Sequence, residues 1–416
     1  MDEYDKISIQ GGFKYAPLEN HSFDLQFNGY ANGEGSHTRT LNADTDIQRN
    51  SLIFKHNWLI GDQWSLETVI RGADYERIHT QKRPWGELVN FNRSAEKQVE
   101  FEENILFENG NNSVNLGMEF SNSVFSSNRV LNGQQQLYSR GVFFQWHREV
   151  SVKIDAIIGS RFDYYNSMKV VLSPRLTMMY SYKQRWKFRA SWGTGFRLPS
   201  FMNQYIDLDH IQFGYRILGN PDLKPESSEG ITLGMEYYHP ARYQISLFIY
   251  QNRFKDMISD YSIEPGLFTY ENVDRVSYRG LEIQGRWIIS SRWLANWGYN
   301  YLDNRDESTD RMIANTQPHS ASIRVSFKSV FGRFSSAVKI KLVGPYYPEE
   351  YIPELGEYIR SKSKRPLFGT INATGKIKLT QLFGFSFGVQ NLTDYTDERY
   401  GPFIGRSIYI ELITEI

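Results

Sequence analysis

Histidine and aromatic side chains in the polar segments of this 416-residue sequence are the groups best suited to contact a ligand. A histidine nitrogen can serve as an axial ligand to haem iron, and aromatic rings can line a small-molecule pocket. The candidates are His79, Trp85, Tyr205, His210, Tyr261, Tyr346, Tyr347 and Tyr351. The eight histidines are scattered, so a solvated surface histidine is the simpler interpretation of each. These positions are therefore predicted contacts for a small ligand whose identity the sequence does not give.

Motifs for catalysis and for metal binding are absent. The sequence contains no GxSxG, HExxH or GxxxxGK[ST] spacing. Carboxylates gather at 303–310 (DNRDESTD) and 207–209 (DLD), but neither stretch has the glycine-pinned ligand spacing of a calcium loop. Without any cysteine, disulfides and thiolate metal sites are excluded. We therefore predict no enzyme activity, no metal site and no cofactor.

Composition narrows the class of protein further. Basic and acidic side chains are equal in number, 47 of each, so there is no electrostatic reason to expect a nucleic-acid partner. No run of about 18 apolar residues is present, which argues against a membrane-spanning helix. The start, MDEYDKISIQ, lacks the basic and apolar regions of a secretion signal. The chain is therefore cytoplasmic, already processed, or part of something longer.

A period of two in hydrophobicity runs through almost the whole chain. Apolar residues alternate with polar ones in 231–237, 281–287 and 321–328, as expected for strands with one dry face. Roughly 19 segments of about 9–13 residues show this pattern, a length that matches a tilted strand crossing a bilayer. No long window follows a helical period. The sequence therefore predicts an all-β fold.

The spacing of turns separates a membrane barrel from a soluble sandwich. Short turns such as GDQ, NGNN and SSR alternate with long polar loops, and a sandwich has no reason to sort its loops in this way. The expected long loops are 32–47, 77–96, 126–136, 196–228, 304–316 and 347–365. An excess of aromatic residues, with 27 Tyr, 27 Phe and 9 Trp, suits the two membrane interfaces. We expect an antiparallel transmembrane β-barrel of the bacterial outer membrane, since a sandwich or propeller would use shorter strands.

Strand parity indicates that the barrel is incomplete. The first expected strand, about 4–15, runs toward the short turn PLEN, so it would start on the extracellular side. Bacterial barrels have an even number of strands and both termini in the periplasm. An unpaired edge in hydrocarbon is costly, because its backbone groups lack partners. We therefore expect an odd number of strands, such as three, upstream of residues 1–416, unless our count is wrong by one.

Four ordered blocks carry a resemblance to a known family. SWGTGFRLPSFMNQY (191–205), GNPDLKPE (219–226), SYRGLEIQGRW (277–287) and GVQNLTDYTDERY (388–400) resemble the TonB-dependent receptors of Gram-negative bacteria. The last strand resembles the C-terminal signature of such barrels, although it ends in Ile416 where Phe is usual. The positions that match the family motifs are Gly195, Arg197, Pro199, Gly219, Asn220, Pro221, Leu223, Lys224, Pro225, Glu226, Arg279, Gly280, Glu282, Asn391, Leu392 and Asp394.

This resemblance implies a barrel of 22 strands, of which about 19 are in this sequence, filled by an N-terminal plug domain. It also implies uptake of a scarce solute, such as an iron-siderophore, haem or cobalamin, with energy from the TonB complex. No segment here resembles the plug, so we expect one receptor-like barrel domain over 1–416 without it. The alternative is a passive pore or a barrel fragment with no transport of its own. Outer-membrane proteases and phospholipases are also barrels, but they need far fewer strands than this sequence predicts, which argues against an enzyme.

Charged residues on the polar face of the expected strands would line the lumen of the barrel. They are Arg189, Glu236, Glu282, Arg286, Arg324, Lys339 and Lys341. They are candidate contacts for a plug domain, and a generic hydrated lining is the simpler interpretation of any one of them. Lipid, the plug, the TonB complex and a small-molecule ligand are thus the expected partners.

Overall fold

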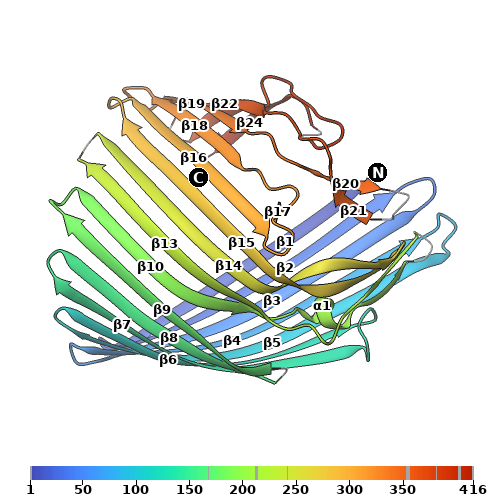
Figure 1. The fold of residues 1–416 in the computed structure, drawn as a ribbon, viewed down its shortest axis with the longest axis horizontal. Helices are drawn as coiled ribbons and strands as arrows, with labels where there is room; N and C mark the ends of the chain where they lie inside the picture. The colour runs from blue at the N-terminus through green and yellow to red at the C-terminus, as the bar shows by residue number, and fades with distance from the viewer. Residues whose placement is uncertain are drawn as a thin grey trace.

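The computed structural model describes residues 2–166, 168–210, 214–240, 242–352, 357–380, 382–401 and 404–414. Its dominant feature is one strongly curved sheet that is almost entirely antiparallel (Figure 1). The first ten strands are β1 (Asp2–Leu18), β2 (His21–His37), β3 (Asn42–Ile60), β4 (Trp64–Lys82), β5 (Leu88–Asn109), β6 (Asn112–Ser127), β7 (Gln134–Ser151), β8 (Ile154–Tyr165), β9 (Met168–Tyr182) and β10 (Trp186–Arg197). The remaining long strands are β13 (Glu226–His239), β14 (Tyr243–Glu264), β15 (Leu267–Ile288), β16 (Trp293–Asp306), β18 (His319–Lys328), β19 (Phe334–Val343), β22 (Phe368–Lys378), β23 (Phe383–Gln390) and β24 (Ser407–Thr414).

The long strands pair in chain order. Each one is antiparallel to the next, with β10 pairing to β13, β16 to β18 and β19 to β22 across the insertions. Three shorter strands belong to the same 22-stranded sheet: β11 (Asp207–His210), β12 (Tyr215–Leu218) and β17 (Arg311–Met312). Leaving these three aside, the described residues form 19 long strands, as the sequence predicts.

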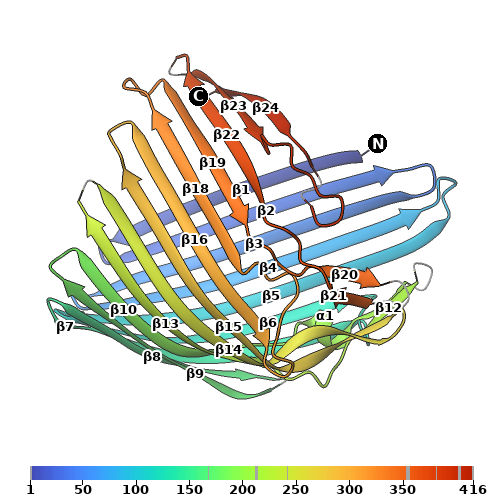
Figure 2. The same cartoon turned by 45° about the horizontal axis from the view of Figure 1, so that its top comes forward.

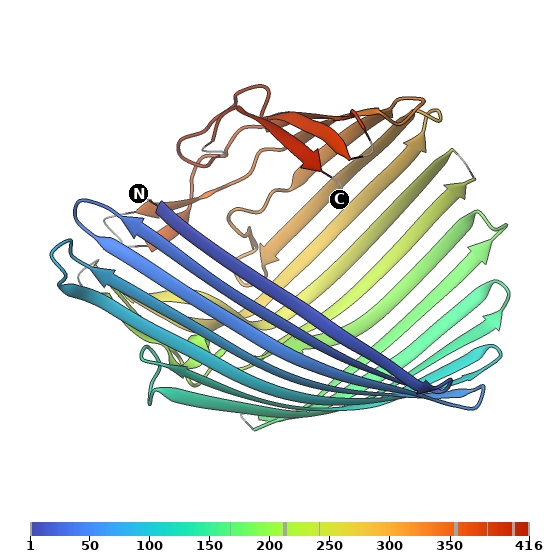
Figure 3. The same ribbon diagram turned by 180° about the vertical axis from the view of Figure 1, so that it is seen from behind.

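The sheet curls into a barrel wall whose two edges do not meet. In the described residues β1 pairs only with β2, and β24 pairs only with β23. Figure 3 shows β1 and β24 as the two edge strands. Aliphatic side chains near these edges are exposed, with Ile7 at 63% and Ile410 at 75%. The backbone groups along both edges therefore lack sheet partners in this structure.

Alternation places the two kinds of side chain on opposite faces of the sheet. Ile231 and Leu233 of β13 lie on the convex face and are half exposed, as lipid contact requires. Thr232 and Glu236 share the opposite face with Ser246 of β14, which lines the concave side. The predicted division into an apolar outer face and a polar inner face is therefore confirmed for this strand.

Strand length is where the expectation from sequence is wrong. Strands β5, β14 and β15 have 22 residues each, well beyond 9–13. The predicted loops at 32–47 and 77–96 are largely strand, because their polar residues continue the cross-strand pairing of β2 to β5. The predicted loop at 126–136 is shorter in the structure, since β6 ends at Ser127 and β7 begins at Gln134. The turn at 265–266 is also tight, so short and long connections do not alternate strictly. A polar alternating segment above the apolar band still forms a ladder, since ladder bonds do not require apolar side chains.

The true long connections lie at one end of the sheet, called the loop end here. They are 198–225, 307–318, 344–367 and 391–406. They contain the helix α1 (Phe201–Tyr205), the hairpin β11–β12, the short strand β17, and the hairpin of β20 (Glu349–Ile352) with β21 (Glu357–Arg360). Figure 2 shows α1, β12 and the β20–β21 hairpin at this end. Among the described residues, no helix is long and apolar enough to cross a membrane.

Candidate functional site

An ion pair closes the longest connection of the loop end. Arg197 ends β10 and Glu226 begins β13, and the two residues face each other in register. The Arg197 guanidinium makes two hydrogen bonds to the Glu226 carboxylate, one with a nitrogen–oxygen distance of 2.6 Å. Oε1 of Glu226 also accepts a bond of 2.8 Å from the backbone N–H of Ile258 on β14. The buried carboxylate therefore fixes three strands at the foot of the loop.

Residues 198–207 fold back on the hairpin of β6 and β7. Ser200 caps α1 by accepting from the N–H of Asn203, and Phe201 stacks on Phe125 of β6 with 5.6 Å between ring centroids. The backbone N–H of Leu131 donates to Tyr205 O at 2.8 Å. The loop is thereby joined to the turn between β6 and β7.

The GNPDLKPE block is held by backbone contacts that leave no space at Gly219. A Cβ added there would lie 2.5 Å from the backbone of Gln204 and Tyr205, so only glycine fits. Asn220 Nδ2 donates to Tyr270 O at 2.9 Å. Asn272 of β15 holds the backbone of Lys224 from both sides, accepting from its N–H at 2.8 Å and donating to its carbonyl at 2.9 Å. Pro199 and Leu223 are buried, Pro225 is half-buried and Pro221 is exposed.

These contacts lead to a testable expectation for Glu226. Glu226→Ala should destabilise the foot of the loop by about 1–3 kcal/mol, because the buried N–H of Ile258 loses its acceptor. Amide exchange at Ile258, measured by hydrogen–deuterium exchange, checks this. Glu226→Gln is the matched control: it keeps an oxygen for Ile258 and should lose less protection. Equal loss of amide protection in both variants would show that the ion pair with Arg197, which both variants remove, contributes more than the buried acceptor.

The RGLE block lies in the middle of β15. Gly280 faces Tyr250 of β14 so closely that an added Cβ would lie 2.3 Å from the ring. Arg279 is exposed, whereas Glu282 is half-buried on the concave face. The glycine thus lets an aromatic ring of the neighbouring strand cross the sheet surface.

The NLTD block forms a compact turn after β23. Asn391 is buried with a φ of 51°, and its Nδ2 donates to Tyr395 O at 2.7 Å. Its Oδ1 accepts from the N–H of Tyr395 at 3.2 Å. Asp394 accepts from the N–H of Arg406 at 2.7 Å, which closes the loop just before β24, while Leu392 is exposed.

Arg365 joins two of the long connections, although no pattern in the sequence marks it as a site residue. Its side chain is 3% exposed and its guanidinium carbon lies 3.8 Å from the centroid of the Phe368 ring. Nη1 donates to Tyr346 Oη at 2.9 Å and to Tyr400 O at 3.2 Å, and Nη2 donates to Gly401 O. Nε lies 3.2 Å from Oδ2 of Asp397 as an ion pair. One buried cation therefore binds segment 344–367 to segment 391–406.

A second contact joins the same two segments. The Tyr400 hydroxyl donates to Glu350 Oε1 at 2.6 Å, and Arg399 forms an ion pair with Oε2 at 2.7 Å. We call Glu350, Arg365, Asp397, Arg399 and Tyr400 the loop clamp.

The loop clamp should loosen in acid. Burial raises the pKa of Asp397, but backbone N–H donors from Tyr400 and Arg399, together with Arg365, lower it on balance below its ordinary value. The pKa of Glu350 is lowered by hydrogen bonds from Ser361 and Tyr400. A carboxylate with a lowered pKa stabilises the fold above its ordinary value, about 4, and this stabilisation is lost as pH falls through the lowered value.

We therefore expect amide protection of 391–401 to be constant from about pH 8 to 5 and to fall below about pH 4. Hydrogen exchange corrected for the intrinsic pH dependence measures it. Asp397→Asn should flatten this transition, and an unchanged transition in that variant would assign it to other groups.

The predicted ligand contacts do not gather into one pocket. Tyr346 is buried against Arg365, and Tyr347 lies under the guanidinium of Arg360 at 3.8 Å. His79 bonds to Thr45 at 2.8 Å on β3 and β4, while Trp85 is 72% exposed and donates to Glu87 at 2.9 Å. Tyr205 ends α1 and Tyr261 is exposed on β14. The side chains of His210 and Tyr351 lie outside the described residues. Their role in ligand binding stays a prediction.

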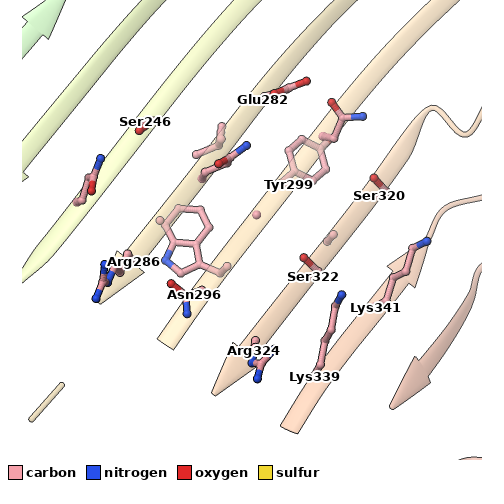
Figure 4. Close-up of a pocket in the computed structure, with 18 residues that line it drawn as sticks. Ser246, Glu282, Arg286, Asn296, Tyr299, Ser320, Ser322, Arg324, Lys339 and Lys341 are labelled. Carbon is pink, nitrogen blue, oxygen red and sulfur yellow. The ribbon is translucent and has the colours of Figure 1, made fainter. Parts of the chain in front are cut away.

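The concave face brings together several of the predicted lumenal charges. A recess of about 730 Å³ is lined by Arg286, Arg324, Lys339, Lys341 and Glu282 along with amide and hydroxyl groups (Figure 4). Arg189 and Glu236 lie outside the recess lining and form an ion pair of 2.7 Å. No group of three or more His, Cys, Asp or Glu side chains that could hold a metal ion occurs in the part of the chain that the structure describes.

Curated relatives match parts of the chain. The vitamin B12 transporter BtuB of Vibrio vulnificus is 34% identical over 131 residues, covering 30% of this chain and 19% of that protein. The iron-regulated outer membrane virulence protein of Vibrio cholerae is 24% identical over 241 residues, covering 55% of this chain and 34% of that protein. The matched segments thus span about a third or less of these relatives.

Solved structures share the fold. The ferric enterobactin receptor PfeA of Pseudomonas aeruginosa superposes with a TM-score of 0.80 at 14% identity, covering 99% of this chain and 70% of that one. The siderophore receptor PirA of Acinetobacter baumannii gives 0.78 at 14% identity, covering 99% and 71%. At these identities the likeness shows the fold alone.

The family model described as "TonB dependent receptor-like, beta-barrel" matches residues 2–392, nearly the whole chain. The sheet of long antiparallel strands, its apolar convex face and the outer-membrane relatives place the protein in the bacterial outer membrane. The chain belongs to the TonB-dependent receptor-like β-barrel family.

Proposed function

We propose that this chain is the barrel part of an energy-coupled receptor that takes up a scarce solute of the iron-siderophore, haem or cobalamin class. The observation that carries the proposal is the family match over 2–392, together with relatives named as a vitamin B12 transporter and an iron-regulated outer membrane protein. A plug domain inside the lumen and the TonB complex are the proposed partners. The polar concave face supports this, because a lumen-filling domain needs polar contacts that can separate.

The loop end is the proposed entry for the solute. The loop clamp and the Glu226 carboxylate hold the long connections in place, so that side chains between them are presented on a rigid support. Trp85 and Tyr261 are exposed aromatic residues at this end and are the proposed ligand contacts that can be tested most directly. Aromatic residues offer large contact areas at a low entropic cost.

A binding panel tests the proposal. The detergent-solubilised chain is titrated with ferric enterobactin, haemin and cyanocobalamin, and binding is followed by isothermal titration calorimetry. We expect one of the three to bind saturably, and we expect Trp85→Ala or Tyr261→Ala to weaken that binding. Phe331→Ala is the control, because Phe331 is exposed in the short turn at the opposite end of the sheet. Absence of binding by all three would contradict the proposed solute classes.

A passive pore, or a barrel segment with no transport of its own, is the alternative function. The polar concave face of the wall is compatible with it, because a large barrel whose lumen holds no further domain leaves an aqueous channel. Conductance across a planar bilayer separates the two functions: a plugged receptor should be closed, whereas an open pore should conduct. Steady conductance by the chain together with a plug domain would favour the alternative.

A further inference from the structure

The recess on the concave face concentrates positive charge without matching negative charge. Asn296 of β16 is in register with Arg286 on one side and Arg324 on the other, and Arg324 is directly opposite Lys339 of β19. Lys341 lies two residues further along β19, opposite Ser322. Because neighbouring strands are about 4.8 Å apart, the row from β15 to β19 spans about 14 Å. Four cations therefore share a short stretch of wall in which Glu282 is the acidic lining residue.

Some other cations of the same face are neutralised by carboxylates. Arg71 pairs with Glu100 and Glu102 at 3.4 and 3.1 Å. Arg161 pairs with Glu119 at 3.0 Å and Asp163 at 2.8 Å. Within the described residues, no such ion pair involves any of the four recess cations. The recess thus differs from the positions of Arg71 and Arg161, where carboxylates lie beside the cation.

The arrangement is unfavourable when the recess holds only water. Like charges directly opposite on neighbouring strands destabilise a sheet, and Arg324 and Lys339 are such a pair. An anion with several negative charges would relieve this repulsion. Arginine offers a planar pair of donors that matches phosphate or carboxylate oxygens, and lysine offers a compact charge beside it. Asn296, Gln284 and Ser322 add neutral donors in the same lining.

We propose that this recess, lined by Arg286, Arg324, Lys339 and Lys341, is a binding site for a small, multiply charged oxyanion. The clustered oxygens of the ligand would be those of phosphates or of carboxylates. Arg324, Lys339 and Lys341 would form the core of the site, and Arg286 would bind the far end of a longer ligand. The site lies on the concave face that the proposed plug domain would also contact, so its test uses this chain alone and does not depend on uptake.

Inorganic pyrophosphate and citrate are the probes, because they carry the two kinds of oxyanion. They are titrated by calorimetry into the detergent-solubilised full chain at low ionic strength. We expect saturable binding of at least one probe with one site per chain, which weakens as salt is added. Preference between the two probes identifies the phosphate or the carboxylate chemistry. Absence of binding by both would overturn the proposal.

Two double variants with the same charge change separate a site from general attraction. Arg324→Gln/Lys339→Gln should raise Kd by about tenfold or more, which is ~1.4 kcal/mol. Arg175→Gln/Lys187→Gln removes two exposed cations from β9 and β10, outside the recess, and should change Kd by less than about twofold. Circular dichroism confirms that all proteins are folded. Equal losses of affinity in both variants would overturn the proposal. Polyglutamate is titrated as a third probe, and binding of polyglutamate alone would also overturn the proposal, because it would assign the recess to an acidic protein segment.

Discussion

Arg365→Met should release segment 391–406 from segment 344–367, at a cost of about 3–5 kcal/mol in the free energy of local opening. The substitution leaves the carboxylate of Asp397 without its cation and removes the donors to Tyr346 Oη and to two backbone carbonyls. Removing one partner of a buried pair costs more than the pair contributes, because the other polar groups stay buried. Methionine keeps the stacking against Phe368, so the loss reflects the polar contacts.

Hydrogen–deuterium exchange of the 391–401 amides measures this effect. Arg399→Met is the matched control, because Arg399 is 63% exposed and its ion pair with Glu350 should contribute about 1 kcal/mol or less. Arg365→Lys should lower amide protection about as much as Arg365→Met, since an ammonium group cannot make the same forked contacts. If Arg399→Met loosened the loop as much as Arg365→Met, the buried cation would not be the main link.

Asn391→Ala should destabilise the turn after β23 by about 3 kcal/mol. The backbone at Asn391 has a φ of 51°, which alanine adopts only with strain. The side chain also exchanges two hydrogen bonds with the backbone of Tyr395. Loss of both contributions should free the chain that leads into β24.

Asn391→Gly separates these two contributions. Glycine accepts the positive φ without strain but cannot make the hydrogen bonds. We therefore expect Asn391→Gly to destabilise the turn by about 1–2 kcal/mol. Amide exchange at Tyr395, together with chemical unfolding in detergent, provides the measurement. Equal effects of alanine and glycine would show that backbone strain contributes little.

The residues of the family motifs have a different role in the structure from the one that their types suggest. Arg197 and Glu226 are charged residues in a sequence motif, and such residues often act on ligands. In the structure they close a loop, and Gly219 is needed because a backbone passes within contact distance. In this chain these motif residues therefore have a structural role in building the loop end.

Arg365 could not be found from the sequence. It lies in a polar stretch with several other basic residues, and nothing in its spacing marks it as buried. Its partners are 19 and 35 residues away along the chain for Tyr346 and Tyr400. Only the folding of two separate loops against each other makes it the centre of the loop clamp.

The sequence by itself determined the fold class and the faces of the strands. A period of two is a local property, since each residue's face follows from its neighbours, and this was enough to predict 19 long strands with a polar inner side. It did not determine where polar strands end, because ladder bonds continue wherever a partner strand is present. Which cations are neutralised was decided by the tertiary structure alone: Arg189 meets Glu236, whereas Arg324 meets Lys339. The physical reason is that register across strands decides which charges become neighbours, directly opposite or diagonally, and register depends on the whole sheet.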